Sequence, residues 1–234
     1  MFKTEQLLVN CFKKKHVKTF LERVFPEGKE ISFTAIDEYK SSFSGIPDLV
    51  IGIPRLEQIE ARPPLDINHV VYLPNIPINS RLTVKEFAEK YRVSLTTARN
   101  CIKSFVNSGF FEPSENHSFL KVKEYIPAFQ KIVGIEAKLK NWQRALTQAY
   151  RYKHFSNCVY VVLDEHYARP AIKAIDEFKR FNVGLVSISE AELTVHFTSK
   201  ENDPFKSAPF IRASEAILAN CFQANQETIS FCSI

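Results

Sequence analysis

The sequence predicts an α/β fold with some parallel strand pairing, together with a compact helical unit. In residues 131–222, short apolar runs alternate with segments of helical periodicity, which is typical of a sheet covered by helices. Earlier in the chain, several prolines follow residue 54, and two closely spaced helical patterns come after them. The chain therefore combines an α/β part with a smaller, mainly helical unit.

Composition and charge restrict the class of protein. The 234 residues are 45% hydrophobic and carry 31 basic against 26 acidic side chains, a net charge of +5, which permits nucleic acid as a partner without requiring it. No apolar run approaches the ~20 residues that span a bilayer, and there is no leader-like stretch and no Gly-x-x-x-x-Gly-Lys phosphate loop. The five scattered cysteines form no Cys-x-x-Cys pair. We expect a reduced, cytoplasmic protein with no membrane partner and no nucleotide cofactor.

The first part of the chain predicts a helix and two strands. Apolar residues at helical spacing indicate a helix over Thr4–Phe25, which Pro26 ends. Ile31–Ile36 and Ile46–Ile53 have the composition of strands, and the second contains one carboxylate, Asp48. A carboxylate in a buried strand is costly unless it is paired or binds a metal.

The middle of the chain begins as a proline-punctuated linker at residues 63–79. Thr83 and Glu86 then form a capping-box pattern at the start of a helix over Val84–Tyr91. A short turn leads to a second helix over Leu95–Ser108, and two short strands around a polar turn follow up to residue 123.

The last part predicts strands and helices in alternation, with the final strand at a sheet edge. The expected strands are Lys131–Lys138, Cys158–Leu163, Val183–Ile188 and Leu193–Thr198, and the expected helices are Trp142–His154, Tyr167–Phe181 and Ala208–Phe222.

The motif Glu136-Ala137-Lys138 is the sharpest chemical feature of the sequence. Residues two apart on a strand point to the same face, so the carboxylate and the ammonium are expected together. The pattern alone is weak, because Glu-x-Lys occurs three more times in the chain. Its surroundings distinguish it, since Asp48 lies on an earlier strand and Gln148 and Tyr152 share one face of the next helix.

Taken in order, three segments resemble the motifs of the PD-(D/E)XK nuclease superfamily with the Gln-x-x-x-Tyr variant of its RecB-type branch: Gly45-Ile46-Pro47-Asp48, Glu136-Ala137-Lys138 and Gln148-Ala149-Tyr150-Arg151-Tyr152. The resemblance covers the first helix and two strands and roughly residues 131–188. It implies a restriction-endonuclease-like mixed sheet flanked by helices, and metal-dependent hydrolysis of DNA phosphodiesters. The gap between Asp48 and Glu136 is far longer than a bare nuclease core needs. We therefore expect core segments at 1–62 and 129–234, with an inserted domain and its linker at 63–128.

The resemblance also implies a metal site. Asp48, Glu136 and the Ala137 carbonyl are expected to bind Mg²⁺, which is a hard cation that prefers oxygen ligands, with Mn²⁺ as a substitute. Family members often add an acidic residue upstream. Glu38 is the first candidate for that position and Glu5 is the second.

Three further residues complete the expected catalytic set. Lys138 is expected to orient the attacking water and to stabilise charge on the phosphate. Gln148 is expected to position the nucleophile or the phosphate, with Tyr152 in support. An alternative interpretation is purely structural, with Asp48 as a turn residue and Glu136 and Lys138 as a solvated pair at a sheet edge.

The inserted unit resembles a winged helix-turn-helix. Residues 81–124 contain eight basic against five acidic side chains, and polar residues gather near the start of the second helix, where such proteins contact DNA. An alternative is that the unit packs on a protein partner or on the core. The expected DNA contacts are Thr96, Thr97, Arg99 and Lys103 on the helix and Lys121 and Lys123 on the wing.

These features predict a Mg²⁺-dependent DNA endonuclease that an inserted domain directs to its substrate. Cutting both strands of a duplex requires two active sites, so a homodimer or a larger nucleoprotein complex is expected. Two alternatives remain. One is a non-catalytic DNA-binding regulator or complex subunit built on a nuclease scaffold, and the other is a nuclease for RNA or structured nucleic acid.

Overall fold

The computed structural model describes residues 1–26, 33–37, 39, 45–60, 62–204 and 207–225. Its centre is a six-stranded mixed sheet in the order β1-β2-β6-β7-β8-β9, in which β6, β7 and β8 run parallel and the other neighbours are antiparallel. The predicted α/β class is confirmed. The strands are β1 (Thr34–Asp37), β2 (Leu49–Pro54), β6 (Phe129–Lys138), β7 (Cys158–Asp164), β8 (Gly184–Ile188) and β9 (Leu193–Phe197).

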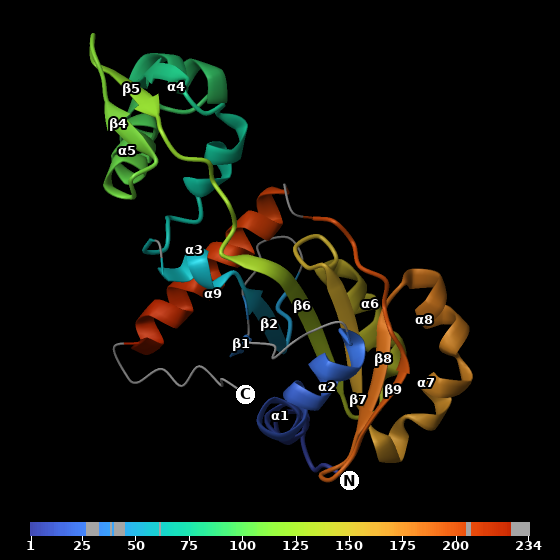
Figure 1. The fold of residues 1–234 in the computed structure, drawn as a ribbon. Helices are drawn as coiled ribbons and strands as arrows, with labels where there is room; N and C mark the ends of the chain where they lie inside the picture. Colours follow the sequence, from blue (N-terminus) through green and yellow to red (C-terminus); the bar gives the residue numbers. More distant parts are fainter. Residues whose placement is uncertain (27–32, 38, 40–44, 61, 205–206, 226–234) are drawn as a thin grey trace.

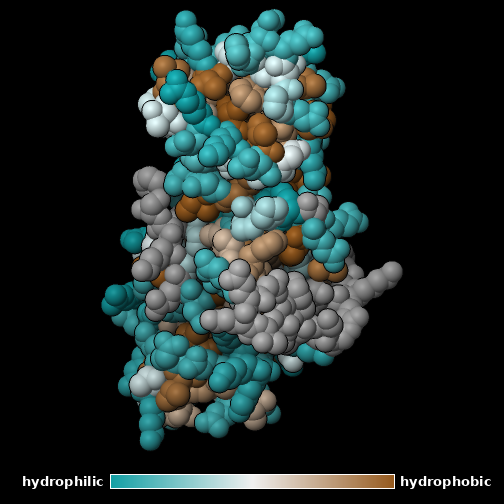
Figure 2. Space-filling model, turned by 90° about the vertical axis from the view of Figure 1, so that its left-hand side faces the viewer, coloured by the Kyte–Doolittle hydropathy of each residue, from teal (hydrophilic) through white to brown (hydrophobic). Residues whose placement is uncertain are grey.

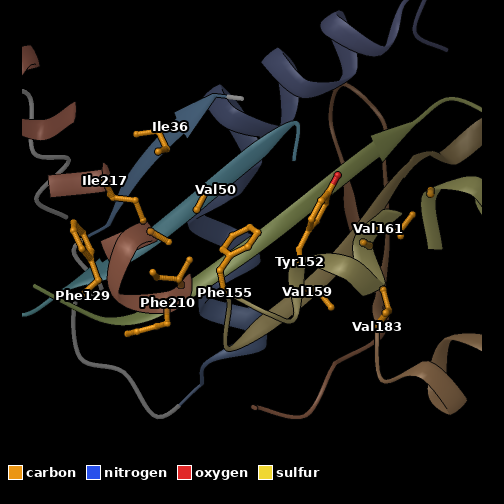
Figure 3. Packing of buried hydrophobic residues seen from close by; sticks show 14 of the residues in the cluster. Ile36, Val50, Phe129, Tyr152, Phe155, Val159, Val161, Val183, Phe210 and Ile217 are labelled. Atoms are coloured by element: carbon orange, nitrogen blue, oxygen red, sulfur yellow. The ribbon is translucent and has the colours of Figure 1, made fainter. Parts of the chain in front are cut away.

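Helices cover both faces of this sheet (Figure 1). Strand residues alternate between the faces, so Ile51 and Ile135 pack beneath the N-terminal helices, whereas Val50 and Val159 pack beneath the later ones (Figure 3). The N-terminal face carries α1 (Glu5–Cys11), the π-helical turn η1 (Phe12–His16) and α2 (Val17–Val24). The other carries α6 (Trp142–Tyr152), α7 (Arg169–Lys173), α8 (Ile175–Phe181) and α9 (Ala208–Asn225), and the 3-10 turn η3 (Glu165–Tyr167) joins β7 to α7.

Three details of the large sheet and its helices differ from the sequence prediction. The first helix contains a π-helical turn, which buries both Phe12 and His16 and lets His16 bond the Ser189 carbonyl at 2.9 Å. The helix predicted over Tyr167–Phe181 is broken at Ala174, whose backbone leaves the helical region. The predicted strand at Ile31–Ile36 begins only at Thr34 among the described residues.

Residues 81–121 form a separate three-stranded antiparallel sheet with two helices (Figure 1). The predicted capping box at Thr83 is present, because its hydroxyl accepts from the Glu86 amide and the Glu86 carboxylate accepts from the Thr83 amide. The first strand, three residues long, is not predicted by the sequence. The elements are β3 (Arg81–Thr83), α4 (Val84–Tyr91), α5 (Leu95–Asn107), β4 (Phe111–Pro113) and β5 (Ser118–Lys121), and the sheet order is β3-β5-β4.

The stretch predicted as a linker, residues 63–79, is instead packed structure. Leu65, Val70 and Leu73 are buried in one cluster with Phe87 and Phe105 of the helices. Pro74 lies inside a 3-10 helix here, and apolar residues between the prolines are buried in this core. The short elements before and within the stretch are α3 (Leu56–Glu60) and the 3-10 helix η2 (Val70–Asn75). We call residues 63–125, which build this cluster with Ile211 of α9, the module.

A buried polar cluster fastens the module to α9. The Arg62 guanidinium donates to both carboxylate oxygens of Glu215, at 2.9 and 2.5 Å. The same carboxylate accepts the Tyr125 hydroxyl at 2.9 Å and the Leu65 amide at 2.8 Å. Glu215 therefore holds both ends of the module, since Arg62 and Leu65 lie at its start and Tyr125 at its end.

The surface of the molecule is mainly hydrophilic on the face seen in Figure 2, with hydrophobic residues scattered between polar ones over the module at the top. Within the described ranges, no helix has both the length and the apolar character needed to cross a membrane.

Candidate active site at the end of β6

Asp48 lies beside the end of β6. It directly precedes β2 rather than lying inside the strand as predicted, one residue beyond the antiparallel pair Leu49 and Ile135. Its Oδ2 accepts the backbone amide of Ala137 at 2.8 Å. The carboxylate keeps 31% of its side-chain surface exposed, so it is held by the strand end and remains accessible.

Glu136 and Lys138 lie on the same face of β6, as their spacing predicts. The Lys138 ammonium is 2.9 Å from Glu136 Oε1, and the Glu136 side chain is fully buried. The Tyr152 hydroxyl donates to Glu136 Oε2 at 2.5 Å and approaches the Ile46 carbonyl at 3.1 Å. One oxygen of Glu136 thus faces Tyr152 and the other faces Lys138.

The sequence around Gly134 explains how Tyr152 reaches this position. A side chain at Gly134 would bring a Cβ to 3.1 Å from the Tyr152 Cβ, so glycine lets α6 approach β6 closely. Figure 3 shows Tyr152 beside β6 at the border of the apolar cluster, with its hydroxyl at the end remote from Phe155. The backbone of the tyrosine is therefore anchored in the core while its hydroxyl extends to the carboxylate.

A third carboxylate joins from the first helix. Glu5 Oε2 is 3.1 Å from the Lys138 ammonium. Glu5 lies in the first turn of α1, whose start is fixed by the Thr4 side-chain cap and by a 2.7 Å bond from the Phe2 amide to Asp164. Glu38, the first candidate for the additional acidic residue, lies outside the described residues. Among those described, Glu5 is the upstream acid that reaches the site.

The electrostatics of the cluster are dominated by burial. Burial raises the pKa of Asp48 against the opposing effect of the Ala137 amide and Lys138. Burial, followed by the nearby charge of Asp48, raises the pKa of Glu136. Burial acts to lower the pKa of Lys138, but attraction by Glu136 and Asp48 outweighs it and raises that pKa. The site therefore favours a charged lysine and disfavours fully ionised carboxylates.

Gln148 lies one helical turn before Tyr152 on α6 and is half-buried. Its side-chain oxygen is buried and has no hydrogen-bond partner among the described residues. A buried amide oxygen without a partner is costly, and such atoms in native sites commonly meet a ligand, an ion or a water.

The oxygen atoms at the site are of the type that Mg²⁺ prefers, namely carboxylates and one backbone carbonyl. In the part of the chain that the structure describes, however, no three His, Cys, Asp or Glu side chains are grouped so as to hold a metal ion. Instead, the carboxylates of Glu5, Asp48 and Glu136 surround the Lys138 ammonium.

The residues expected to contact DNA divide into an accessible and an inaccessible group. Thr96, Arg99 and Lys103 are exposed on α5, and no described acidic side chain lies within ion-pair distance of Arg99 or Lys103. Thr97 is half-buried and its amide and hydroxyl are bound to the Ser94 cap. Lys123 is half-buried with its ammonium 5.8 Å from the Phe110 ring centre.

Lys121 does not fit the predicted phosphate contact. It is 2% exposed, and its ammonium donates to the carbonyls of Leu73 at 2.9 Å and Ile76 at 2.5 Å. Burial lowers its pKa. The ammonium closes the end of the 3-10 helix inside the module, so Lys121 is a structural residue.

Two contributions to the site escape sequence reasoning. The Ile46 carbonyl is a backbone group with no residue signature, and the bond from Phe2 to Asp164 joins residues 162 positions apart. The nearest sequence signal to the Ile46 carbonyl is the adjacent Pro47-Asp48 pair, whereas no local pattern marks the bond from Phe2 to Asp164.

No protein-family model, curated protein or solved structure matches the chain.

Proposed function

We propose that this protein is a metal-dependent DNA endonuclease with a restriction-endonuclease-like core of the PD-(D/E)XK type. The observation that carries the proposal is the convergence of Asp48, Glu136 and Lys138. The Lys138 ammonium lies 2.9 Å from Glu136 Oε1 and 3.6 Å from Asp48 Oδ2, although Asp48 and Glu136 are 88 positions apart in sequence. A lysine beside two carboxylates at one strand end suits phosphodiester hydrolysis.

The order of the elements supports the finer description of the fold. Once residues 55–128 are set aside, the elements follow a simple order. This order is a helix, two antiparallel strands, the strand that bears Glu136 and Lys138, a helix and a parallel strand. This order and the positions of the three motifs on it agree with the resemblance noted in the sequence. Tyr152 of α6 bonds to Glu136 on the same strand, and Gln148 lies one helical turn before it.

The donor set fits Mg²⁺ or Mn²⁺. Asp48, Glu136 and the Ala137 carbonyl would hold the ion, with Glu5 as an additional carboxylate. A bound ion would supply Lewis-acid stabilisation of the charge that develops on the phosphate.

The chain's own residues divide the remaining tasks. Lys138 carries the positive charge that can face a phosphate oxygen and orient a water molecule. Tyr152 fixes the rotamer of Glu136 by binding its Oε2, so that Oε1 faces the site. Gln148 offers a free amide oxygen to position the water or the substrate.

The test is a cleavage assay with purified protein on duplex, branched and single-stranded DNA and on RNA, with Mg²⁺ or Mn²⁺. We expect metal-dependent cleavage of DNA. Asp48→Ala and Lys138→Ala should abolish it while leaving the fold and DNA binding intact, whereas Lys140→Ala, an exposed neighbour, should cut normally. Equal cutting by all four proteins contradicts the site assignment, and binding without cleavage by the wild type indicates a non-catalytic DNA-binding subunit.

For the module we propose a winged helix-turn-helix that contacts the DNA backbone through α5. The support is the capped helix pair, the β4–β5 hairpin and the exposed Arg99 and Lys103. Replacing both residues by alanine should weaken DNA binding about tenfold and flatten its salt dependence. Lys85→Ala on the preceding helix is the control. Unchanged affinity of the double variant argues that this face binds a protein instead.

The active form is proposed to be a homodimer or part of a larger nucleoprotein complex, because one site cuts one strand. Sedimentation of the protein with and without duplex DNA tests this. A protein that remains a monomer on DNA and only nicks it contradicts the dimer.

A further inference from the structure

The Lys138 ammonium lies at the centre of a shell of oxygen atoms. It is 2.9 Å from Glu136 Oε1, 3.0 Å from the Ala137 carbonyl, 3.1 Å from Glu5 Oε2 and 3.6 Å from Asp48 Oδ2. The shell comes from α1, from the residue before β2 and from β6. Only 13% of the Lys138 side-chain surface is exposed, so the ammonium is enclosed by these groups.

These oxygens are the ones that the proposed function assigns to the metal ion. Mg²⁺ holds its oxygen ligands at roughly 2.0–2.1 Å, whereas the ammonium keeps them about one ångström farther away. A divalent cation and the ammonium would also repel each other strongly at such a short separation. The two cations therefore cannot occupy the same shell.

We infer that Lys138 is the resident counter-cation of the metal-free site, and that a divalent cation binds only when this ammonium withdraws from the carboxylates. The inference rests on the proposed function, whose ligands it uses. The lysine stem has four rotatable carbons and can move its ammonium without moving β6. The withdrawn ammonium, still next to the site, is then the charge available to a phosphate oxygen.

The Lys138 ammonium and a divalent cation therefore compete for the same oxygen atoms. Three carboxylates and one ammonium leave an excess of negative charge, which attracts a cation, but the ammonium reduces that attraction. Removing the ammonium should therefore strengthen metal binding even though it destroys catalysis. A lysine that merely supports the fold would not give this opposite response.

The experiment is calorimetric titration of Mn²⁺ into the metal-free full-length protein without DNA. Lys138→Met, which keeps the stem and removes the charge, should bind Mn²⁺ about tenfold or more tightly than the wild type, because one positive charge has left the shell. Lys140→Met should bind like the wild type. Affinity of Lys138→Met equal to or below that of the wild type overturns the inference.

A second measurement avoids reliance on the folding of Lys138→Met. In the wild type with labelled lysine side chains, titration with Mg²⁺ should shift the NMR signal of the Lys138 ε-methylene group and leave that of Lys140 in place. Saturation of the site with no change at Lys138 overturns the inference and leaves the nuclease proposal standing. If neither the wild type nor Lys138→Met binds Mn²⁺ and the wild type does not cut DNA, the inference and the nuclease proposal are both wrong.

Discussion

Two clusters of buried charge in this protein differ in how completely their carboxylates are hydrogen-bonded. At the junction with the module, the Glu215 carboxylate accepts four hydrogen bonds, two from Arg62 and one each from Tyr125 and Leu65. At the end of β6, three carboxylates share one ammonium, and Glu136 Oε1 faces it without a directional hydrogen bond.

This difference is what we expect between a structural cluster and the candidate functional one. The buried Glu215 carboxylate has both oxygens bonded, although the Arg62 Nε–H lacks a partner among the described residues. Such a pair resists change, because removing either partner exposes a desolvated charge. In the other cluster, burial raises the pKa values of Asp48 and Glu136, and perturbed carboxyl groups of this kind are typical of functional sites. The first cluster joins the module to α9, and the second is where we expect chemistry.

The largest expected effect is on cleavage. Glu136→Gln preserves the shape of the buried side chain but removes its charge, so we expect cleavage to fall about 100- to 1,000-fold with little change in thermal stability. Initial rates at saturating DNA and Mg²⁺ measure this. Glu215→Gln, the same chemical change in the other cluster, should destabilise the fold and leave the rate per folded molecule nearly unchanged. A similar rate loss in both variants would break the distinction.

The next effect is on stability at the junction. Arg62→Met leaves the Glu215 carboxylate buried without its counter-charge, so the free energy of unfolding should fall by about 3–5 kcal/mol. Urea unfolding followed by far-UV circular dichroism measures this. The double variant Arg62→Met/Glu215→Leu should recover most of the loss, since an apolar pair replaces the ion pair. No recovery would mean that the polar cluster has a role beyond joining the two parts.

A matched pair of tyrosines sharpens the comparison. Tyr152→Phe removes the hydroxyl that orients Glu136, so cleavage should fall about 10- to 100-fold, as for other residues that orient a metal ligand. Tyr125→Phe removes the hydroxyl that binds Glu215 and should cost about 1 kcal/mol of stability with no change in cleavage rate. Melting curves and rates measured on the same preparations test both. Equal rate losses in the two variants would contradict the assignment of Tyr152.

The smallest expected effect is a gain in stability. Because burial raises the pKa of Asp48, its ionised form is disfavoured in the folded state, so Asp48→Asn should stabilise the metal-free protein by about 1 kcal/mol at neutral pH. The gain should shrink as the pH falls below the raised pKa, since the wild-type carboxyl then becomes neutral as well. Thermal melts in a chelating buffer at several pH values measure this. A destabilised variant would show that the pair with Lys138 outweighs burial.

The sequence predicts well those parts whose causes are local. The helix Val84–Tyr91 is found with its predicted bounds because Thr83 and Glu86 cap it within three residues. The strand that carries Glu136 and Lys138 is likewise near its predicted range, because its apolar run has no competing helical pattern. Motif order also predicts that Asp48, Glu136, Lys138 and Tyr152 lie together, and their side chains meet at Lys138 and Glu136.

The parts that sequence reasoning missed are fixed by distant contacts. A lysine such as Lys121 is normally expected at the surface. Its burial is explained by the carbonyls of Leu73 and Ile76, which accept from its ammonium and lie more than 40 positions earlier. The prolines of residues 63–79 predict a linker, but apolar residues between them are buried against the helices of the module. Arg62 and Glu215 are 153 positions apart, so their pairing has no local signal.

The module leaves and re-enters the core at one place, which gives the protein an unusual engineering property. The Arg55 amide donates to the Ala128 carbonyl at 2.7 Å, and Pro54 is paired with Phe129 across β2 and β6. A few-residue turn can therefore bridge β2 to β6 in place of residues 56–127, since neighbouring antiparallel strands need no longer loop. Glu215 would lose its partners and should be exchanged for leucine in such a minimal protein. Its candidate active site would be retained, and other domains could be grafted at the same position.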